Sequence, residues 1–288
     1  MREFEMNKCF VKNSTGVLKK VLLCPPDYMK LQPINVIAEK WIKENNELSI
    51  KNCIREHKDL IKAYEENGVE VVLMEPDKNM TNQVFARDFG ACIREGYILG
   101  KFKEPIRREE TEAYRKKLEE LGVPCVAKVT KGFFEGGDFW FLDDNTLAIG
   151  VVARTDEAGI QDIREQIGEY GYSIIPVKCP KENLHLDMCF NIVEEKLAVV
   201  CKQALPDSFI KILEERKFSL IEITQEEVFK LHCNLQALGN GRVISLKSNT
   251  EVNNKLRTYG INVIELELNE ILKNGGGPHC MTFPLERI

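Results

Sequence analysis

A structural unit recurs along this sequence of 288 residues, and the repetition strongly limits the folds that the chain can adopt. Each copy has a short apolar strand, a tight turn, a second strand, an amphipathic helical stretch and a third strand. The copies follow one another at intervals of about 45–50 residues, which is the period of propellers and solenoids. The first strands of four copies begin at Arg87, Glu135, His185 and Cys233.

The fifth copy is divided between the two ends of the chain. Cys280–Leu285 is a first strand with no partner after it, and Gly16–Cys24 is a second strand with no partner before it. If these strands pair, the units close into a ring without a large open sheet edge. We therefore predict an α/β fold, a five-bladed pseudosymmetric α/β propeller closed by its N- and C-terminal strands. An ordinary α/β sheet of unrelated units is the alternative.

Composition excludes several classes of function. The formal net charge is -5, so the chain lacks the basic excess that is typical of nucleic-acid binding. No apolar run approaches the roughly 18 residues of a membrane span, and the N-terminus has no signal-peptide pattern. The 10 cysteines are scattered singly, which favours reduced thiols, a cytoplasmic location and no metal site. We expect a single catalytic domain over residues 1–288 without a cofactor; a homo-oligomer stays open.

The segment Asn274–Pro284 presents one cysteine in an unusual setting. Three glycines and a proline end the preceding helical stretch and place Cys280 at the start of a short apolar strand. A nucleophilic thiol needs backbone that can bend closely around a substrate, which glycine permits. A cysteine that only fills the core is the alternative, because most unpaired cysteines do so.

Polar residues stand at the beginning of the first strand in four copies, where apolar residues would be expected. In a pseudosymmetric ring such positions meet at one end of the central channel, so their side chains are predicted to converge into a functional pocket. Taken singly, each has an ordinary explanation, such as a turn carboxylate or a structural histidine. The residues of this set are Asp88, Glu135, Asp138, His185, Asp187 and Cys280.

Several motifs resemble the guanidine-modifying enzyme superfamily of the pentein fold. This superfamily includes arginine deiminases, dimethylarginine dimethylaminohydrolases and amidinotransferases. The resemblance extends from about residue 16 to the C-terminus, and the combination of motifs is far more specific than any one of them. The motifs are Asn82–Asp88, Glu135–Asp138, His185–Asp187 and Gly276–Cys280, with Val21–Leu23 before Pro25 and the segment Arg154–Gly159.

The resemblance implies a cysteine-dependent reaction at a guanidinium carbon. Cys280 would be the nucleophile, and His185 would first protonate the leaving nitrogen and then activate water. Glu135 would pair with the cationic nitrogens of the substrate. Asp88 and Asp187 would hold the other guanidinium nitrogens, because carboxylates match a guanidinium in fork geometry. The bound cation would also lower the pKa of the thiol.

Two arginines are expected at the far end of the substrate. Arg107 follows Asp88 by the same interval at which Arg154 follows Glu135. In deiminases, arginines at matching offsets bind the substrate carboxylate, for which a guanidinium is well suited. Arg108 remains an alternative to Arg107. The expected substrate-binding set is completed by Asn82 and Asp138.

Three features bear on the substrate and on the residues around the thiol. Arginine deiminases carry an arginine ahead of the catalytic cysteine, where this chain has glycines. Dimethylarginine hydrolases usually lack the aspartate that stands here as Asp187. His279 is expected to point away from the thiol of Cys280, because adjacent strand residues face opposite sides.

The expected activity is hydrolysis of arginine or a close guanidino amino acid to ammonia and citrulline, through a covalent amidino-cysteine intermediate. The enzymatic alternatives are an arginine dihydrolase that gives ornithine, a dimethylarginine dimethylaminohydrolase and an amidinotransferase. A ribosome-binding factor is the non-enzymatic alternative, since such factors share the ring fold but lack the cysteine, histidine and glutamate set. The only expected partner is a small guanidino molecule, with neither nucleic acid nor membrane.

Overall fold

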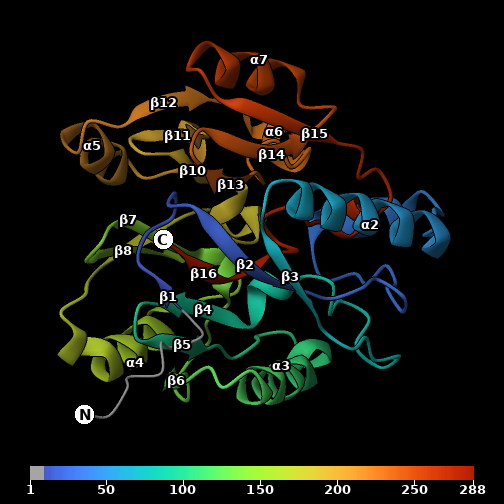
Figure 1. The fold of residues 1–288 in the computed structure, drawn as a ribbon, viewed down its shortest axis with the longest axis horizontal. Helices are drawn as coiled ribbons and strands as arrows, with labels where there is room; N and C mark the ends of the chain where they lie inside the picture. The colour runs from blue at the N-terminus through green and yellow to red at the C-terminus, as the bar shows by residue number, and fades with distance from the viewer. Residues whose placement is uncertain (1–9) are drawn as a thin grey trace.

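The computed structural model describes residues 10–288; residues 1–9, where we noted no signal-peptide pattern, lie outside this range. Residues 10–288 form five sheets, four of three strands and one of four strands. Figure 1 shows helices α2, α3, α4, α5 and α7 at the periphery, with the sheets inside them. The repeating units predicted from the sequence are therefore separate small sheets, each with its own outer helix.

Four of the units share one topology. The first strand pairs antiparallel with the second, and a helix then leads to a third strand that is parallel to the second. The first two units contain β4 (Gly90–Ile93), β5 (Gly96–Leu99), α3 (Arg108–Glu120) and β6 (Cys125–Lys128), then β7 (Phe139–Asp143), β8 (Thr146–Val151), α4 (Glu157–Ile167) and β9 (Ser173–Lys178). The next two contain β10 (Phe190–Glu194), β11 (Leu197–Val200), α5 (Asp207–Glu215) and β12 (Ser219–Glu222), then β13 (Gln236–Gly239), β14 (Arg242–Leu246), α7 (Thr250–Thr258) and β15 (Asn262–Leu266), with α6 (Gln225–Phe229) between them.

The fifth unit joins the two ends of the chain, as predicted. Strand β16 (Phe283–Arg287) pairs antiparallel with β2 (Leu18–Leu23), and β2 pairs parallel with β3 (Glu70–Leu73). Helices α1 (Val36–Lys43) and α2 (Ile50–Glu66) cross from β2 to β3, and β1 (Phe10–Val11) adds a parallel strand beside β16. The predicted pairing of the terminal strands is confirmed.

Helix α2 illustrates how local sequence sets these elements. The Ser49 hydroxyl caps its first turn by accepting a hydrogen bond from the Asn52 N–H. Its buried residues, among them Cys53, Leu60 and Tyr64, recur every three or four positions, so one apolar face packs on the neighbouring strands. Burial of each large apolar side chain stabilises the fold by roughly 1.5–3 kcal/mol.

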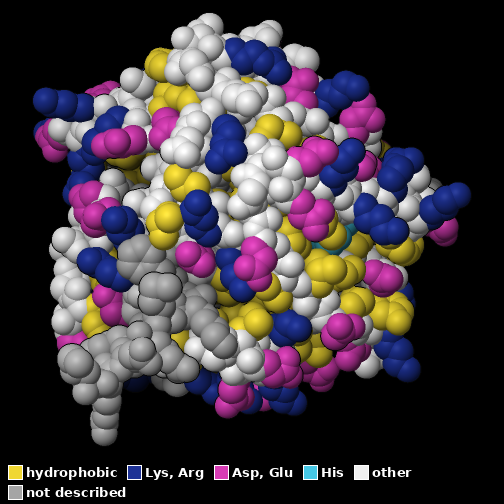
Figure 2. All heavy atoms as spheres, viewed as in Figure 1, with side chains coloured by type: hydrophobic (Ala, Val, Ile, Leu, Met, Phe, Trp, Pro, Cys, Tyr) yellow, Lys and Arg dark blue, Asp and Glu magenta, His cyan; other side chains and the backbone are white. Residues whose placement is uncertain are grey.

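The surface and the cysteines agree with the expectations from composition. Figure 2 shows Lys and Arg side chains intermixed with Asp and Glu side chains on the face turned to the viewer. No helix in the described part of the chain is long and apolar enough to cross a membrane. All cysteines within residues 10–288 are free thiols.

The polar residues of the predicted pocket lie just before the first strands rather than in them. Short 3-10 turns over Ala86–Phe89, Gly136–Asp138 and Leu186–Met188 carry the acidic residues into β4, β7 and β10. These turns pack closely: a Cβ on Gly137 would lie 2.8 Å from Nδ1 of His185. Glycine is therefore needed at this position so that the turns of two neighbouring units can meet.

Candidate active site

One cavity gathers residues that are far apart in the sequence. Its lining includes the turns before β4 and β7, the segment before β10 and the glycine-rich loop before β16. Two predicted residues, Asp138 and Asp187, are not part of the lining. The predicted site residues that line the cavity are Asn82, Asp88, Arg107, Glu135, Arg154, His185 and Cys280.

Cys280 lies in a buried turn and is 3% exposed. Its Sγ is 3.0 Å from Nδ2 of Asn234 and 3.3 Å from Oδ2 of Asp187. Burial raises the pKa of this thiol well above its usual value, and the charges of Asp187 and Asp88 raise it further. The thiol is therefore protonated near neutral pH, and a cation placed beside it would favour the thiolate.

His185 forms a buried ion pair with Glu135. Its Nε2 donates to Oε2 of Glu135 at 2.9 Å, and its Nδ1 lies 3.8 Å from Oδ1 of Asp88. Burial alone would lower the pKa of His185, but Asp88 and the hydrogen bond to Glu135 raise it to about 10. Burial also opposes ionisation of Glu135, yet the hydrogen bond from His185 lowers the pKa of that carboxyl. The imidazole is therefore positively charged near neutral pH and can act as a proton donor.

Asp88 offers one free oxygen to the cavity. Its Oδ2 accepts a hydrogen bond from Arg107 at 2.6 Å, whereas its buried Oδ1 accepts no hydrogen bond from any described residue. Burial raises the pKa of this carboxyl. A planar cation with N–H donors would satisfy the free oxygen.

Arg107 is buried and already fully engaged. Its guanidinium donates to Asp88 and to both carboxylate oxygens of Glu110, and also to the carbonyl oxygens of Asn82 and Phe85. Arg108 is exposed and is absent from the cavity lining. Of the two arginines, only Arg107 reaches the cavity, and it holds the turn that carries Asp88.

Arg154 lies on the opposite wall and is less completely bound. One nitrogen donates to the carbonyl oxygen of Ile34. Another lies 3.5 Å from Oε1 of Glu104 and 3.8 Å from Oε1 of Glu135. These separations are longer than those of Arg107 from its carboxylates, so Arg154 has no close carboxylate partner among residues 10–288.

Asn82 is the remaining predicted residue in the lining. Its Oδ1 accepts a hydrogen bond of 2.7 Å from Nδ2 of Asn274, in the glycine-rich loop. Its own Nδ2 is buried and has no partner among residues 10–288. Asn82 therefore links two walls of the cavity and retains one donor for a ligand.

Asp187 and His279 meet at the thiol from outside the cavity. Oδ2 of Asp187 accepts both the Nδ1–H of His279 at 2.8 Å and the thiol of Cys280. The His279 ring stacks on Trp140 with centroids 4.6 Å apart, and burial lowers the pKa of His279 to about 4. Strand alternation predicted that His279 would point away from Cys280. Both residues lie in a turn rather than a strand, yet His279 is absent from the lining of the cavity that contains Cys280, and the two share only the oxygen of Asp187.

Asp138 positions the turn that follows His185. Its Oδ1 accepts the Leu186 N–H at 2.8 Å, and burial raises the pKa of Asp138 to about 7. Asp138 thus contacts the backbone next to His185 and does not reach the cavity lining. Asp138 and Asp187, both expected to bind the substrate, thus lie outside the cavity lining, and their contact with substrate stays a prediction.

Asn234, which was not predicted as a site residue, holds the loop around the thiol by hydrogen bonds. Its Oδ1 accepts hydrogen bonds of 3.1 Å from the N–H groups of Gly277, His279 and Cys280, and its Nδ2 donates to the thiol. Asn234 precedes the first strand of the fourth unit, as Asp88 precedes β4. The repeat therefore contained the signal that could have identified it.

The cavity also contains a set of groups that could hold a cation. Ligand atoms of Asp88, Glu135 and His185 lie within 4.8 Å of one another. Because the pKa of His185 is about 10, the imidazole would have to lose its proton before it could bind a metal. The carboxylate oxygens of Asp88 and Glu135 suit a planar organic cation without that loss.

Comparisons of the sequence identify its relatives. The family model "N,N dimethylarginine dimethylhydrolase, eukaryotic" matches residues 25–287. The chain is 34% identical over 281 residues to the uncharacterized protein YkgA of Bacillus subtilis, covering 98% of this chain and 96% of that protein. It is 28% identical over 257 residues to an arginine deiminase of Bacillus cytotoxicus, and this match covers 72% of this chain but 62% of the deiminase.

Solved structures share the fold. The N-terminal domain of ArgZ, an arginine dihydrolase from Cyanobacteria, superposes with a TM-score of 0.83 at 23% identity, covering 93% of this chain and 97% of that one. The dimethylarginine hydrolase of Pseudomonas aeruginosa, complexed with citrulline, has a TM-score of 0.78 at 22% identity and covers 93% and 99%. Together with the matching family model, these likenesses place the chain in the dimethylarginine dimethylhydrolase family, within the pentein superfamily of guanidine-modifying enzymes.

Proposed function

We propose that this chain is a cysteine-dependent hydrolase of the guanidinium group of arginine or of a close guanidino amino acid. The observation that carries the proposal is the convergence of three functions in one buried cavity. Cys280 supplies a thiol, the His185–Glu135 pair supplies a charged acid, and Asp88 supplies a free carboxylate oxygen. The deiminases and dihydrolase among its relatives support the same class of substrate.

Binding would use the free oxygen of Asp88 together with Glu135 and Arg154. The guanidinium donates to Oδ1 of Asp88 and to Glu135, and the amino-acid carboxylate reaches Arg154. Arg107 holds the second oxygen of Asp88, so it orients this carboxylate and does not itself bind the substrate carboxylate. The positive charge of the substrate offsets the negative charges that raise the pKa of Cys280, so binding promotes thiolate formation.

The reaction then proceeds in two steps. The thiolate of Cys280 attacks the guanidinium carbon, and a proton from His185 allows ammonia to leave, with an amidino-thioether left on the sulfur. Water then enters, and His185 takes a proton from it as the oxygen attacks the same carbon. The carbon–sulfur bond breaks, which releases citrulline and restores the thiol.

Dimethylarginine is the second candidate substrate, because the matching family model carries that name. The free acceptors of the cavity favour the unsubstituted guanidinium instead. Methylation removes N–H donors, and a buried carboxylate oxygen left without a donor costs roughly 1–3 kcal/mol. We therefore expect arginine to be the better substrate.

Product analysis distinguishes these activities. The purified protein is incubated with arginine or with asymmetric dimethylarginine, each with and without glycine, and ammonia, dimethylamine, citrulline and ornithine are measured. We expect citrulline and ammonia from arginine, with kcat/KM at least about tenfold higher than for dimethylarginine. Ornithine without glycine would indicate a dihydrolase, and glycine-dependent ornithine would indicate a transferase. Faster turnover of dimethylarginine, or no turnover of either compound, would contradict the proposal.

A further inference from the structure

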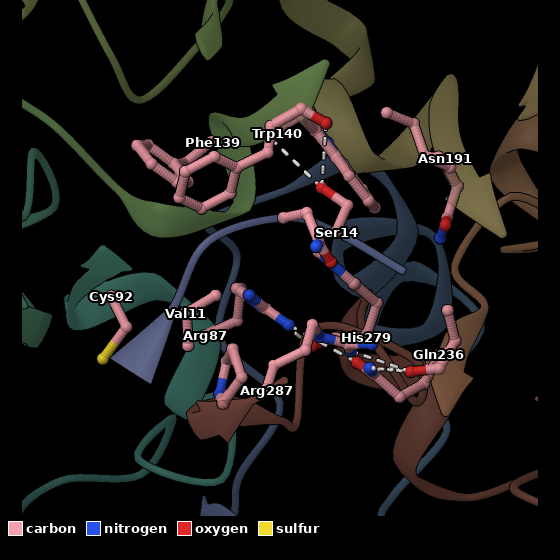
Figure 3. Close-up of a pocket in the computed structure, with 15 residues that line it drawn as sticks. Val11, Ser14, Arg87, Cys92, Phe139, Trp140, Asn191, Gln236, His279 and Arg287 are labelled. Carbon is pink, nitrogen blue, oxygen red and sulfur yellow. Dashed lines mark hydrogen bonds between the residues drawn. The ribbon is translucent and has the colours of Figure 1, made fainter. Parts of the chain in front are cut away.

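A second cavity is separate from the one around Cys280. The two cavities share no lining residue. The chain passes between them at two places, where Arg87 and His279 face the second cavity and their neighbours Asp88 and Cys280 face the first. Figure 3 shows the side chains that approach this second cavity from different elements.

Two buried arginines line the second cavity, and the carboxylates that act on them, Asp187 and Asp88 on Arg87 and Glu194 on Arg287, lie outside its lining. Arg87 is 8% exposed and Arg287 is 3% exposed. Within the described part of the chain, the lining contains no aspartate or glutamate. Among residues 10–288, the hydrogen-bond acceptors of the two guanidinium groups are uncharged oxygens, those of the Gln236 amide and of backbone carbonyls. Buried charges in proteins are normally paired, so these two cations are an exception that calls for a ligand.

The hydrogen bonding of Arg87 is also incomplete. Its Nε lies 3.4 Å from the carbonyl oxygen of His279, and one terminal nitrogen lies 3.4 Å from Oε1 of Gln236, so both bonds are long. The indole N–H of Trp140, which lines the same cavity, is buried and has no acceptor among residues 10–288. By contrast, Arg287 is held at 2.6 Å and 2.8 Å by the carbonyl oxygens of Gly16 and Ala237. The cavity therefore contains one firmly held cation, Arg287, and one loosely held cation, Arg87. The indole N–H of Trp140 is a further donor without an acceptor among residues 10–288.

The electrostatics of the pair indicate the sign of the missing group. Burial lowers the pKa of Arg287 to about 9, and the positive charge of Arg87 contributes in the same direction. Burial likewise lowers the pKa of Arg87. Both side chains stay protonated near neutral pH, so they repel each other in a poorly solvated space. A bound anion would relieve this repulsion and complete the hydrogen bonds.

We propose that the second cavity binds a compact dianionic oxyanion, such as phosphate, between Arg87 and Arg287, with the indole N–H of Trp140 as a further donor. Two buried cations face a cavity whose described lining holds no carboxylate, and guanidinium groups match the oxygens of phosphate and carboxylate in fork geometry. Neighbouring β13 residues orient both arginines, Gln236 through its side chain and Ala237 through its carbonyl. Inorganic phosphate and a small dicarboxylate share this chemistry.

Titration calorimetry tests the site with inorganic phosphate, succinate and acetate in a buffer that is free of other oxyanions. We expect saturable phosphate binding to the wild-type protein. The Kd should rise at least about tenfold in Arg87→Gln and in Arg287→Gln, since each loses a charged partner. The control Arg257→Gln removes an exposed arginine that pairs with Glu265, and its Kd should be unchanged. Preferential binding of succinate with the same sensitivity to the two variants would support the site and assign a dicarboxylate.

A second measurement needs no variant and therefore does not depend on how the variants fold. Crystals of the wild-type protein soaked in selenate should show an anomalous peak between the guanidinium groups of Arg87 and Arg287. Circular dichroism establishes which arginine variants are folded. The proposal is overturned if the wild-type protein binds neither phosphate nor succinate, or if folded variants at both arginines bind them as tightly as the wild type does.

Discussion

Cys280 and His185 are both protonated near neutral pH, for different physical reasons. Burial and two carboxylates raise the pKa of the thiol, whereas carboxylates overcome burial to raise the pKa of the imidazole. His185 is thus in its proton-donating form before the substrate binds, whereas Cys280 is not yet the reactive thiolate. A cationic substrate supplies the positive charge that stabilises the thiolate. Formation of the nucleophile therefore depends on binding of a guanidinium.

The raised pKa of Cys280 predicts its reactivity as a function of pH. Without substrate, the rate of alkylation of Cys280 by iodoacetamide should still be rising at pH 9.0, the ordinary pKa of a thiol. Peptide-resolved mass spectrometry measures this rate, with the exposed Cys125 as an internal reference. A rate for Cys280 that levels off below about pH 8 would show a thiolate formed without substrate and would contradict this account.

Arg154 is predicted to recognise the substrate carboxylate. Arg154→Ala should impair turnover of arginine much more than turnover of agmatine, which has no carboxylate. The loss of a charge-assisted contact corresponds to about 2–5 kcal/mol in kcat/KM for arginine. Arg108→Ala is the matched control, because Arg108 is exposed and outside the cavity lining. An equal loss on both substrates would mean that Arg154 only supports the fold.

Asn234 is predicted to act by positioning the loop and the thiol. Asn234→Ala leaves three backbone N–H groups without their acceptor and the sulfur without its donor, so kcat should fall by about 10²-fold. Asn234→Asp keeps the acceptor but replaces the donor with a negative charge. It should shift the alkylation profile of Cys280 to higher pH while the melting temperature changes less than in Asn234→Ala. Normal kcat in both variants would exclude this role.

At the scale of elements, the turns before the first strands determine the site. They are short because each delivers only one or two polar residues before the chain enters a buried strand. The glycine-rich loop before β16 packs against the turn before β4, where a Cβ on Gly276 would lie 2.4 Å from the ring of Phe85. The wall of the cavity that contains Cys280 therefore depends on a residue without a side chain.

Gly276→Ala should displace this loop. We expect a loss of roughly 1–3 kcal/mol in the free energy of unfolding and a clear fall in kcat, because Phe85 or the loop must move. Gly168→Ala is the matched control, since a Cβ there meets no atom within 4 Å. Thermal unfolding and steady-state kinetics of the two variants check the comparison. Equal behaviour of both variants would show that the loop has more space than the structure indicates.

For the whole molecule, the repeat in the sequence predicted the units, their order and the pairing of β2 with β16. It also predicted which polar residues approach one another, because equivalent positions of a pseudosymmetric fold share one end. It could not predict their partners. Glu110 accepts hydrogen bonds from Arg107 because α3 begins immediately after that arginine. The first turn of the helix brings the carboxylate of Glu110 next to the guanidinium. Such contacts depend on the direction of a helix, which spacing along the chain does not determine.

Asn234 shows a different limit. The fourth unit has the amide Asn234 where three other units have aspartates. Its position in the repeat matches those aspartates, but an amide does not by itself suggest catalytic chemistry. Its role became apparent only when the loop of the fifth unit was placed against it. The site is thus assembled across unit boundaries, where sequence periodicity carries the least information.

Covalent trapping on Cys280 tests the central claim most directly. The protein is mixed with arginine, quenched during turnover and digested, and the mass of the peptide that contains Cys280 is measured. We predict an adduct equal to arginine less ammonia on that peptide in the wild type and none in Cys280→Ser, which should bind arginine without turnover. Cys125→Ser, at an exposed thiol, should behave as the wild type. An adduct on another cysteine, a bare amidino group on Cys280, or normal turnover by Cys280→Ser would contradict the account.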